Sequence, residues 1–194
     1  QLLTIRDLPD TRTQGEWLHF SAVWLGQDNF GRDYDACLTL TGPETVQSCQ
    51  PLAPGWATSQ WQPPALVRAR YSWQMPPFLA PGDYELSLQV VTDGEAVDTA
   101  VTLGQLAIQP LPRSYDAPAP AKPLTVTWPA GIRLHGYDLQ SDETSLALTL
   151  HWQAANRLDA SYKFFVHLQD PDSGALVAQT DYVPRDWTYP TTFW

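Results

Sequence analysis

Apolar and polar residues alternate along most of this chain. The segments "WLHFSAVWL", "DYELSLQVV", "SLALTLHW" and "YKFFVHL" each place apolar side chains at every second position. A period of two is typical of a β-strand that buries one face. Turn residues separate such segments at a spacing of roughly 8–12 residues, which favours a β-sandwich. The pattern therefore predicts an all-β fold built from tandem Ig-like β-sandwiches.

The alternation stops in "QPLPRSYDAPAPAKP", Gln109 to Pro123, which is rich in Pro and Ala. Segments of this composition are extended and semi-rigid. We therefore predict a β-sandwich over residues 1–110, a linker over 111–123, and a second domain over 124–194.

The second domain resembles the first in the order and spacing of its motifs. Trp24 matches Trp152 and Tyr34 matches Tyr162 at an offset of 128 residues. Beyond the next hairpin the offset is 133. The matched pairs there are Thr58 with Thr191 and Trp61 with Trp194. A strand, a Tyr-containing strand, a hairpin and a Thr-x-x-Trp ending thus occur twice, which indicates an internal repeat.

The second copy contains only the first half of the repeat. After "WATSQW" the first copy continues with four strand-like segments, "LVRARYSWQM", "LAPGDYELSLQVV", "AVDTAVTL" and "QLAIQP". The second copy therefore lacks an opposing sheet for its inward residues, which are Leu146, Leu148, Leu150, Trp152, Tyr162, Phe164 and Val166. Because uncovered apolar surface is costly, we expect residues 144–194 to be covered. The cover is either a continuation of the chain or strands from a neighbouring chain.

Composition narrows the class of partner. The formal net charge is −10, which opposes binding to nucleic acid, since phosphate recognition needs clustered Lys and Arg. Nine Trp and 12% aromatic residues are typical of a folded chain. No segment approaches the roughly 18 apolar residues of a membrane-spanning helix. Low charge with many neutral polar residues favours an extracytoplasmic β-protein.

The only two cysteines, Cys37 and Cys49, lie six residues on either side of Pro43. If Gly42-Pro43-Glu44 forms a turn, the two side chains face each other across a hairpin, where a disulfide can form. The alternative is a pair of unbridged small residues. A disulfide would favour an oxidising compartment.

Three stretches carry a family resemblance. "GIRLHGYDLQ", "LALTLHWQAANRLDASYKFFVHLQDPDSGALVAQTDYVP" and "YPTTFW" are similar to a module of certain bacterial envelope proteins. It recurs in the extracytoplasmic C-terminal part of polytopic membrane glycosyltransferases of the dolichyl-phosphate-mannose type. The resemblance covers about 70 residues well and the first domain loosely. It implies an accessory domain associated with surface polysaccharide chemistry, and it carries over no catalytic residue.

The histidines and acidic residues are weaker candidates for a metal or catalytic site. His151 and His167 fall on outward strand positions, and we expect them to lie near each other on one sheet without a metal. Asp170 and Asp172 in "QDPDSGA" indicate a hairpin turn, with calcium binding as the alternative. No catalytic motif is present. We therefore expect no enzyme activity from this segment and no cofactor.

Aromatic residues in turn-rich stretches are the best binding candidates. Trp56, Trp187 and Tyr189 are candidate carbohydrate contacts, since flat aromatic faces stack on sugar rings. Trp61 and Trp194 are expected to be structural plugs. The sequence thus favours a non-catalytic extracytoplasmic accessory module that binds or positions glycan. The alternative is a cell-surface or filament subunit completed by a neighbour's strands.

Overall fold

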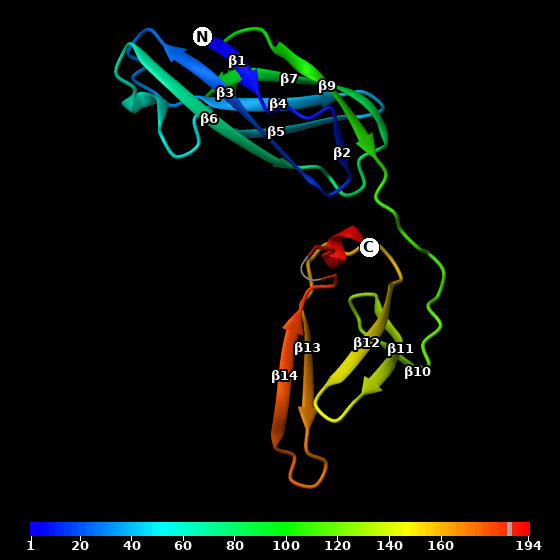
Figure 1. Cartoon of the computed structure of the whole chain (residues 1–194). Helices are drawn as coiled ribbons and strands as arrows, with labels where there is room; N and C mark the ends of the chain where they lie inside the picture. The colour runs from blue at the N-terminus through cyan, green and yellow to red at the C-terminus, as the bar shows by residue number, and fades with distance from the viewer. Residues whose placement is uncertain (186–187) are drawn as a thin grey trace. The chain divides into compact units, whose positions relative to one another are not determined.

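The computed structural model describes residues 1–185 and 188–194 and is all-β, apart from two short 3-10 helices (Figure 1). The chain divides into two compact units, Gln1–Leu111 and Pro112–Trp194, each of which is described by itself. The division falls at the start of the predicted linker. Over the described residues, no helix has the length and apolar character needed to cross a membrane.

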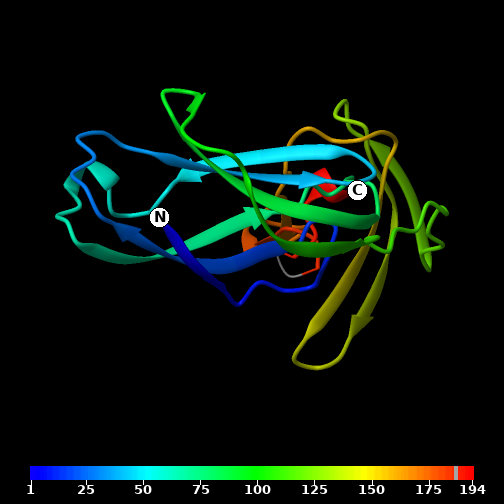
Figure 2. The same cartoon turned by 90° about the horizontal axis from the view of Figure 1, so that it is seen from above.

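Unit 1 contains two sheets that lie face to face (Figures 1 and 2). The first sheet has the order β1 (Leu2–Arg6), β3 (Trp17–Gly26), β6 (Ala65–Gln74). The second has the order β2 (Thr11–Thr13), β9 (Val101–Gln109), β7 (Gly82–Thr92), β4 (Asp35–Thr41), β5 (Thr45–Pro51), with β8 (Glu95–Ala96) beside β7. Neighbouring strands are antiparallel except β2 and β9.

The core of unit 1 lies between these sheets and follows the alternation of the sequence. Leu18, Phe20, Ala22 and Trp24 of β3 are all buried, and Leu38, Leu40, Leu86 and Leu88 face them from β4 and β7. Along the whole of β6, buried residues alternate with exposed ones, so every second side chain of this strand points to solvent. The period-two prediction for these strands is confirmed.

Two linked hydrogen bonds lie within this apolar core. The indole Nε1–H of Trp24 donates to the Tyr71 hydroxyl at 3.0 Å, and that hydroxyl donates to the Leu52 carbonyl at 2.6 Å. Burial raises the pKa of the Tyr71 hydroxyl above its usual value. Tyr71 on β6 thus supplies an acceptor for the buried Trp24 N–H on β3, which would be costly to bury without one.

The end of unit 1 differs from the sequence prediction. "AVDTAVTL" and "QLAIQP" were expected as two strands, but β9 begins only at Val101, takes in the last three residues of the first segment and continues through the second to Gln109. Its register against β7 shifts between Leu86 and Ser87, where the partners change from Gly104 to Thr102. A bulge absorbs one extra residue, so the strand continues instead of ending. The strands β1 and β2 also lie outside the segments that the alternation selected.

Unit 2 contains two small sheets. One has the order β10 (Lys122–Thr127), β11 (Ile132–Ser141), β12 (Leu146–Ala154), and the other pairs β13 (Phe164–Gln169) with β14 (Leu176–Tyr182). Residues 110–121 have no regular structure, whereas β10 begins at Lys122, inside the stretch predicted as linker. Among the described residues of unit 2, few apolar side chains are buried: Ile132, Leu134, Leu158, Val183 and Phe193.

The predicted disulfide is confirmed. Cys37 on β4 pairs directly with Cys49 on β5 across the hairpin, and the two Cα atoms are 4.0 Å apart. The strands end at Thr41 and resume at Thr45, so the turn lies where Gly42-Pro43-Glu44 was expected.

We expect the double variant Cys37→Ala, Cys49→Ala to lower the free energy of unfolding of unit 1 by about 3 kcal/mol, because the bridge closes a short loop in the unfolded chain. Denaturant-dependent hydrogen exchange of β3 and β6 peptides measures this quantity. The β13–β14 hairpin of unit 2 serves as the internal control, and its exchange should not change. Equal loss of protection in both units would contradict the prediction.

Candidate functional site

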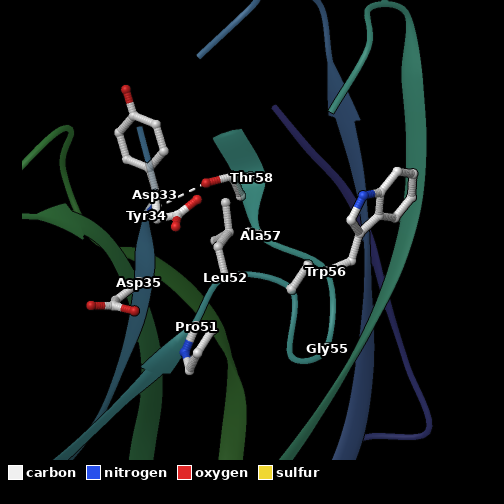
Figure 3. A pocket seen from close by; sticks show the side chains of 10 residues that line it. Asp33, Tyr34, Asp35, Pro51, Leu52, Gly55, Trp56, Ala57 and Thr58 are labelled. Carbon is white, nitrogen blue, oxygen red and sulfur yellow. Dashed lines mark hydrogen bonds between the residues drawn. The ribbon is translucent and has the colours of Figure 1, made fainter. Parts of the chain in front are cut away.

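A hollow of about 380 Å³ lies at one end of unit 1. Its lining comes from the segment before β4, the end of β5, and the loop that leads into the 3-10 helix η1 (Thr58–Gln60). The residues that line it are Asp33, Tyr34, Asp35, Pro51, Leu52, Ala53, Gly55, Trp56, Ala57 and Thr58 (Figure 3). Volumes of this order are usual for ligand sites.

The loop over the hollow is built by a tight turn. The Trp56 backbone N–H donates to the Ala53 carbonyl at 3.0 Å, and Gly55 has φ +87°, a conformation that favours glycine. The chain then enters η1 at Thr58, which is almost fully buried. The turn therefore fixes where the Trp56 side chain leaves the backbone.

Thr58 ties this loop to the segment before β4. Its Oγ1 accepts the Tyr34 backbone N–H at 2.9 Å and donates to the Arg32 carbonyl at 3.1 Å. The neighbouring Asp33 carboxylate accepts the Ser59 N–H at 2.9 Å, and this bond lowers the pKa of Asp33 below its usual value. The hollow therefore presents an ionised carboxylate at neutral pH, held by the same loop.

The Trp56 indole forms an aromatic edge beside the hollow. It is 45% exposed, while its neighbour Trp61 is buried, and the two ring centroids are 6.1 Å apart. Figure 3 shows the indole directed away from the carboxylates of Asp33 and Asp35. The aromatic surface and the hydrogen-bond acceptors therefore lie on different sides of the loop.

Unit 2 repeats the threonine contacts at the residues that the sequence repeat pairs. The Thr191 Oγ1 accepts the Tyr162 N–H at 2.8 Å and donates to the Ala160 carbonyl at 2.8 Å. A 3-10 helix, η2 (Thr191–Phe193), begins at this threonine, as η1 begins at Thr58.

The two tryptophans of the repeat also make the same bond. The Trp194 indole Nε1–H donates to the carbonyl five residues earlier at 3.4 Å, and the Trp61 indole does likewise. Trp61 is buried, as expected for a plug, whereas Trp194 stays partly exposed and stacks on Phe164. The two loops thus share one hydrogen-bond pattern.

Tyr189, another candidate carbohydrate contact, offers less open surface than Trp56. The Arg185 guanidinium lies over the Tyr189 ring, 4.5 Å from its centroid, and Phe193 packs edge-on against that ring. One face of Tyr189 is therefore covered. Trp187 lies outside the described residues. Sugar contact at these two positions stays a prediction.

The histidines do not lie as expected. His151 is on β12 and His167 is on β13, which belong to different sheets, so they are not neighbours on one sheet. The spacing placed both on outward positions but could not assign the sheet. His151 Nε2 instead lies 2.7 Å from the Asp138 carboxylate across the β11–β12 pair. Among the described residues, no group of three or more His, Cys, Asp or Glu converges.

Two acidic residues of unit 2, Asp170 and Asp142, serve local structure. The Asp170 carboxylate accepts the N–H groups of Asp172 and Ser173, which closes the β13–β14 turn, as predicted. The Asp142 carboxylate does the same for Thr144 and Ser145, and these bonds lower the pKa of Asp142 to about 2. Such carboxylates are engaged as turn caps.

Sequence reasoning missed Asp33 and Asp35. Both flank Tyr34, which the repeat had marked, so "DYD" was the available signal. The carboxylates come close to the Trp56 loop only because the Cys-bridged hairpin returns the chain from β4 to β5. The chain matches no protein-family model and no curated protein.

We expect Thr58→Val to lower the free energy of unfolding of unit 1 by about 1–3 kcal/mol, because it leaves the Tyr34 N–H and the Arg32 carbonyl without their partner. Thr58→Ser keeps the hydroxyl and is the matched control. Chemical denaturation followed by hydrogen exchange of unit 1 peptides measures the change. If the valine variant is as stable as the serine variant, the hydroxyl does not hold the loop.

Proposed function

We propose that this chain is a non-catalytic extracytoplasmic accessory module that binds or positions glycan for a membrane glycosyltransferase or a related envelope protein. The observation that carries the proposal is the half-exposed Trp56 indole on a loop whose other side presents Asp33 and Asp35. An indole face stacks on the C–H face of a sugar, and carboxylates accept hydrogen bonds from sugar hydroxyls.

The separation of these two features indicates the size of the glycan. The indole points away from the carboxylates across the loop (Figure 3). A sugar stacked on the outward side of the Trp56 indole faces away from Asp33 and Asp35, whereas a short oligosaccharide that crosses the loop can contact the indole with one residue and Asp33 or Asp35 with another. We therefore propose that the glycan is a short chain of sugars.

Several features favour the extracytoplasmic location. The Cys37–Cys49 disulfide is typical of oxidising compartments. The resemblance of residues 131–194 to modules of bacterial membrane glycosyltransferases points to the same side of the membrane. The shared contacts of Thr58 and Thr191 favour two homologous Ig-like modules in tandem. In this interpretation the first module is complete and the second contributes its first half.

A cell-surface or filament subunit is the second candidate function. An apolar groove between the two sheets of unit 2 favours it, since strands from a neighbouring chain would fill such a groove. This candidate requires association of separate chains. A polymer in solution, measured by light scattering, would favour it over the accessory module.

We expect Trp56→Ala to weaken oligosaccharide binding by about five- to thirtyfold, since loss of one stacking ring removes about 1–2 kcal/mol. Trp17→Ala is the matched control, because Trp17 is 51% exposed on the same unit but lies outside the hollow. A glycan array identifies the ligand, and calorimetry measures its Kd for both variants.

Two outcomes of these binding measurements would contradict the proposal. Equal weakening by both variants would contradict a site at Trp56, and the absence of binding to any glycan would contradict the function. Asp35→Asn tests the other side of the loop. It should weaken an oligosaccharide and leave the affinity of a single sugar that stacks on Trp56 unchanged.

A further inference from the structure

The inward face of unit 2 is an open apolar groove between its two sheets. The groove has a volume of about 430 Å³, and β12 and β13 supply most of its apolar lining. Leu146 and Leu148 on β12 are 52% and 37% exposed. In unit 1 the corresponding positions of β3, Leu18 and Phe20, are buried in the core. The surface that is a core in unit 1 is therefore exposed in unit 2.

Both strands that line the groove have an unpaired edge. In unit 1, β3 pairs with β1 and β6, and β4 pairs with β5 and β7. In the described part of unit 2, β12 pairs only with β11, and β13 pairs only with β14. The free edges are those that β6 and β7 occupy in unit 1, and unpaired backbone groups on such edges accept further strands.

A buried donor identifies one side chain that this surface needs. The Trp152 indole Nε1 is buried and has no hydrogen-bond partner among the described residues. Its counterpart in unit 1, Trp24, donates to the Tyr71 hydroxyl on β6. A buried N–H without an acceptor is costly. Among the described residues of unit 2, neither a strand nor a hydroxyl takes the place that β6 and Tyr71 have beside this tryptophan in unit 1.

We propose that a strand with the side-chain pattern of β6, supplied by the same polypeptide beyond residue 194, pairs with the free edge of β12 and places a tyrosine hydroxyl on Trp152 Nε1. The register follows from unit 1, where Phe20 pairs with Tyr71. The counterpart of Phe20 at the repeat offset is Leu148. The new tyrosine therefore lies opposite Leu148, with an apolar residue at every second position facing the groove.

The geometry of the chain favours this source over a separate molecule. In unit 1 only three residues separate Trp61 from the first residue of β6, Ala65. Trp194 makes the same bond at the end of η2 as Trp61 makes at the end of η1. A strand tethered this closely has an effective concentration in the millimolar range or above, which a free partner does not reach. This inference does not depend on glycan binding.

The test extends the full chain with its own second half-domain. The residues 62–109 are appended after Trp194, which places the sequence of β6, β7 and β9 next to unit 2. The signal of the Trp152 indole N–H is assigned in an NMR spectrum with Trp152→Phe. We expect its hydrogen exchange to slow at least tenfold in the extended chain, and β12 peptides to gain protection by mass spectrometry.

A matched variant isolates the hydroxyl. In the appended copy only, the residue that derives from Tyr71 is changed to Phe. The strand should still dock and protect β12, while the Trp152 N–H keeps the fast exchange of the unextended chain. If this variant protects the indole as well as the tyrosine does, the proposed hydrogen bond is wrong.

Two further outcomes would overturn the proposal. One is that the extended chain shows no added protection of β12 or of the Trp152 N–H. The other is that a separate peptide of residues 62–109 gives the same protection at micromolar concentration, which would assign the groove to another chain. Neither result depends on glycan affinity, so failure here is distinguishable from failure of the proposed function.

Discussion

The fold depends on one physical constraint, which is that a sheet with an apolar face must be covered by a second layer. Unit 1 meets this constraint fully, because Leu18, Phe20 and Trp24 of β3 share one buried core with Leu38 and Leu86 of the other sheet. Unit 2 has the same kinds of residues on β12 and β13 but only two small sheets around an open groove. In unit 1, β6 and β7 complete the two layers around the core, whereas the corresponding residues of β12 line an open groove in unit 2.

The position of Trp152 shows how this constraint reaches single atoms. A tryptophan is useful in a core because it buries a large apolar surface, but its N–H then requires an acceptor. The Tyr71 hydroxyl is that acceptor for Trp24, and it donates its own hydrogen to the Leu52 carbonyl. In unit 1 the strand that covers the core thus also satisfies its polar atom, whereas the described residues of unit 2 leave the Trp152 N–H without an acceptor beside an apolar groove.

The candidate glycan site depends on a buried threonine at the end of the Trp56 loop, and the second unit has an equivalent threonine. Thr58 holds the chain before β4 against the Trp56 loop, and the bridged hairpin brings Asp35 to the same place. In the proposed site, a loop fixed by these bonds would let the half-exposed indole stack on a sugar with little loss of conformational freedom. Thr191 makes the equivalent bonds, but Arg185 covers the Tyr189 ring in that loop.

The sequence alone determined the all-β class, the buried faces of the long strands of unit 1, the bridged hairpin and the match of Thr58 with Thr191, because strand periodicity and turn chemistry are local. Only the tertiary structure decided which strands share a sheet. The pairing places His151 and His167 in different sheets, joins residues 101–103 to the next predicted strand in β9, and brings Asp33 and Asp35 near Trp56. Strand pairing joins residues that are distant in the chain, and no local pattern records the partner.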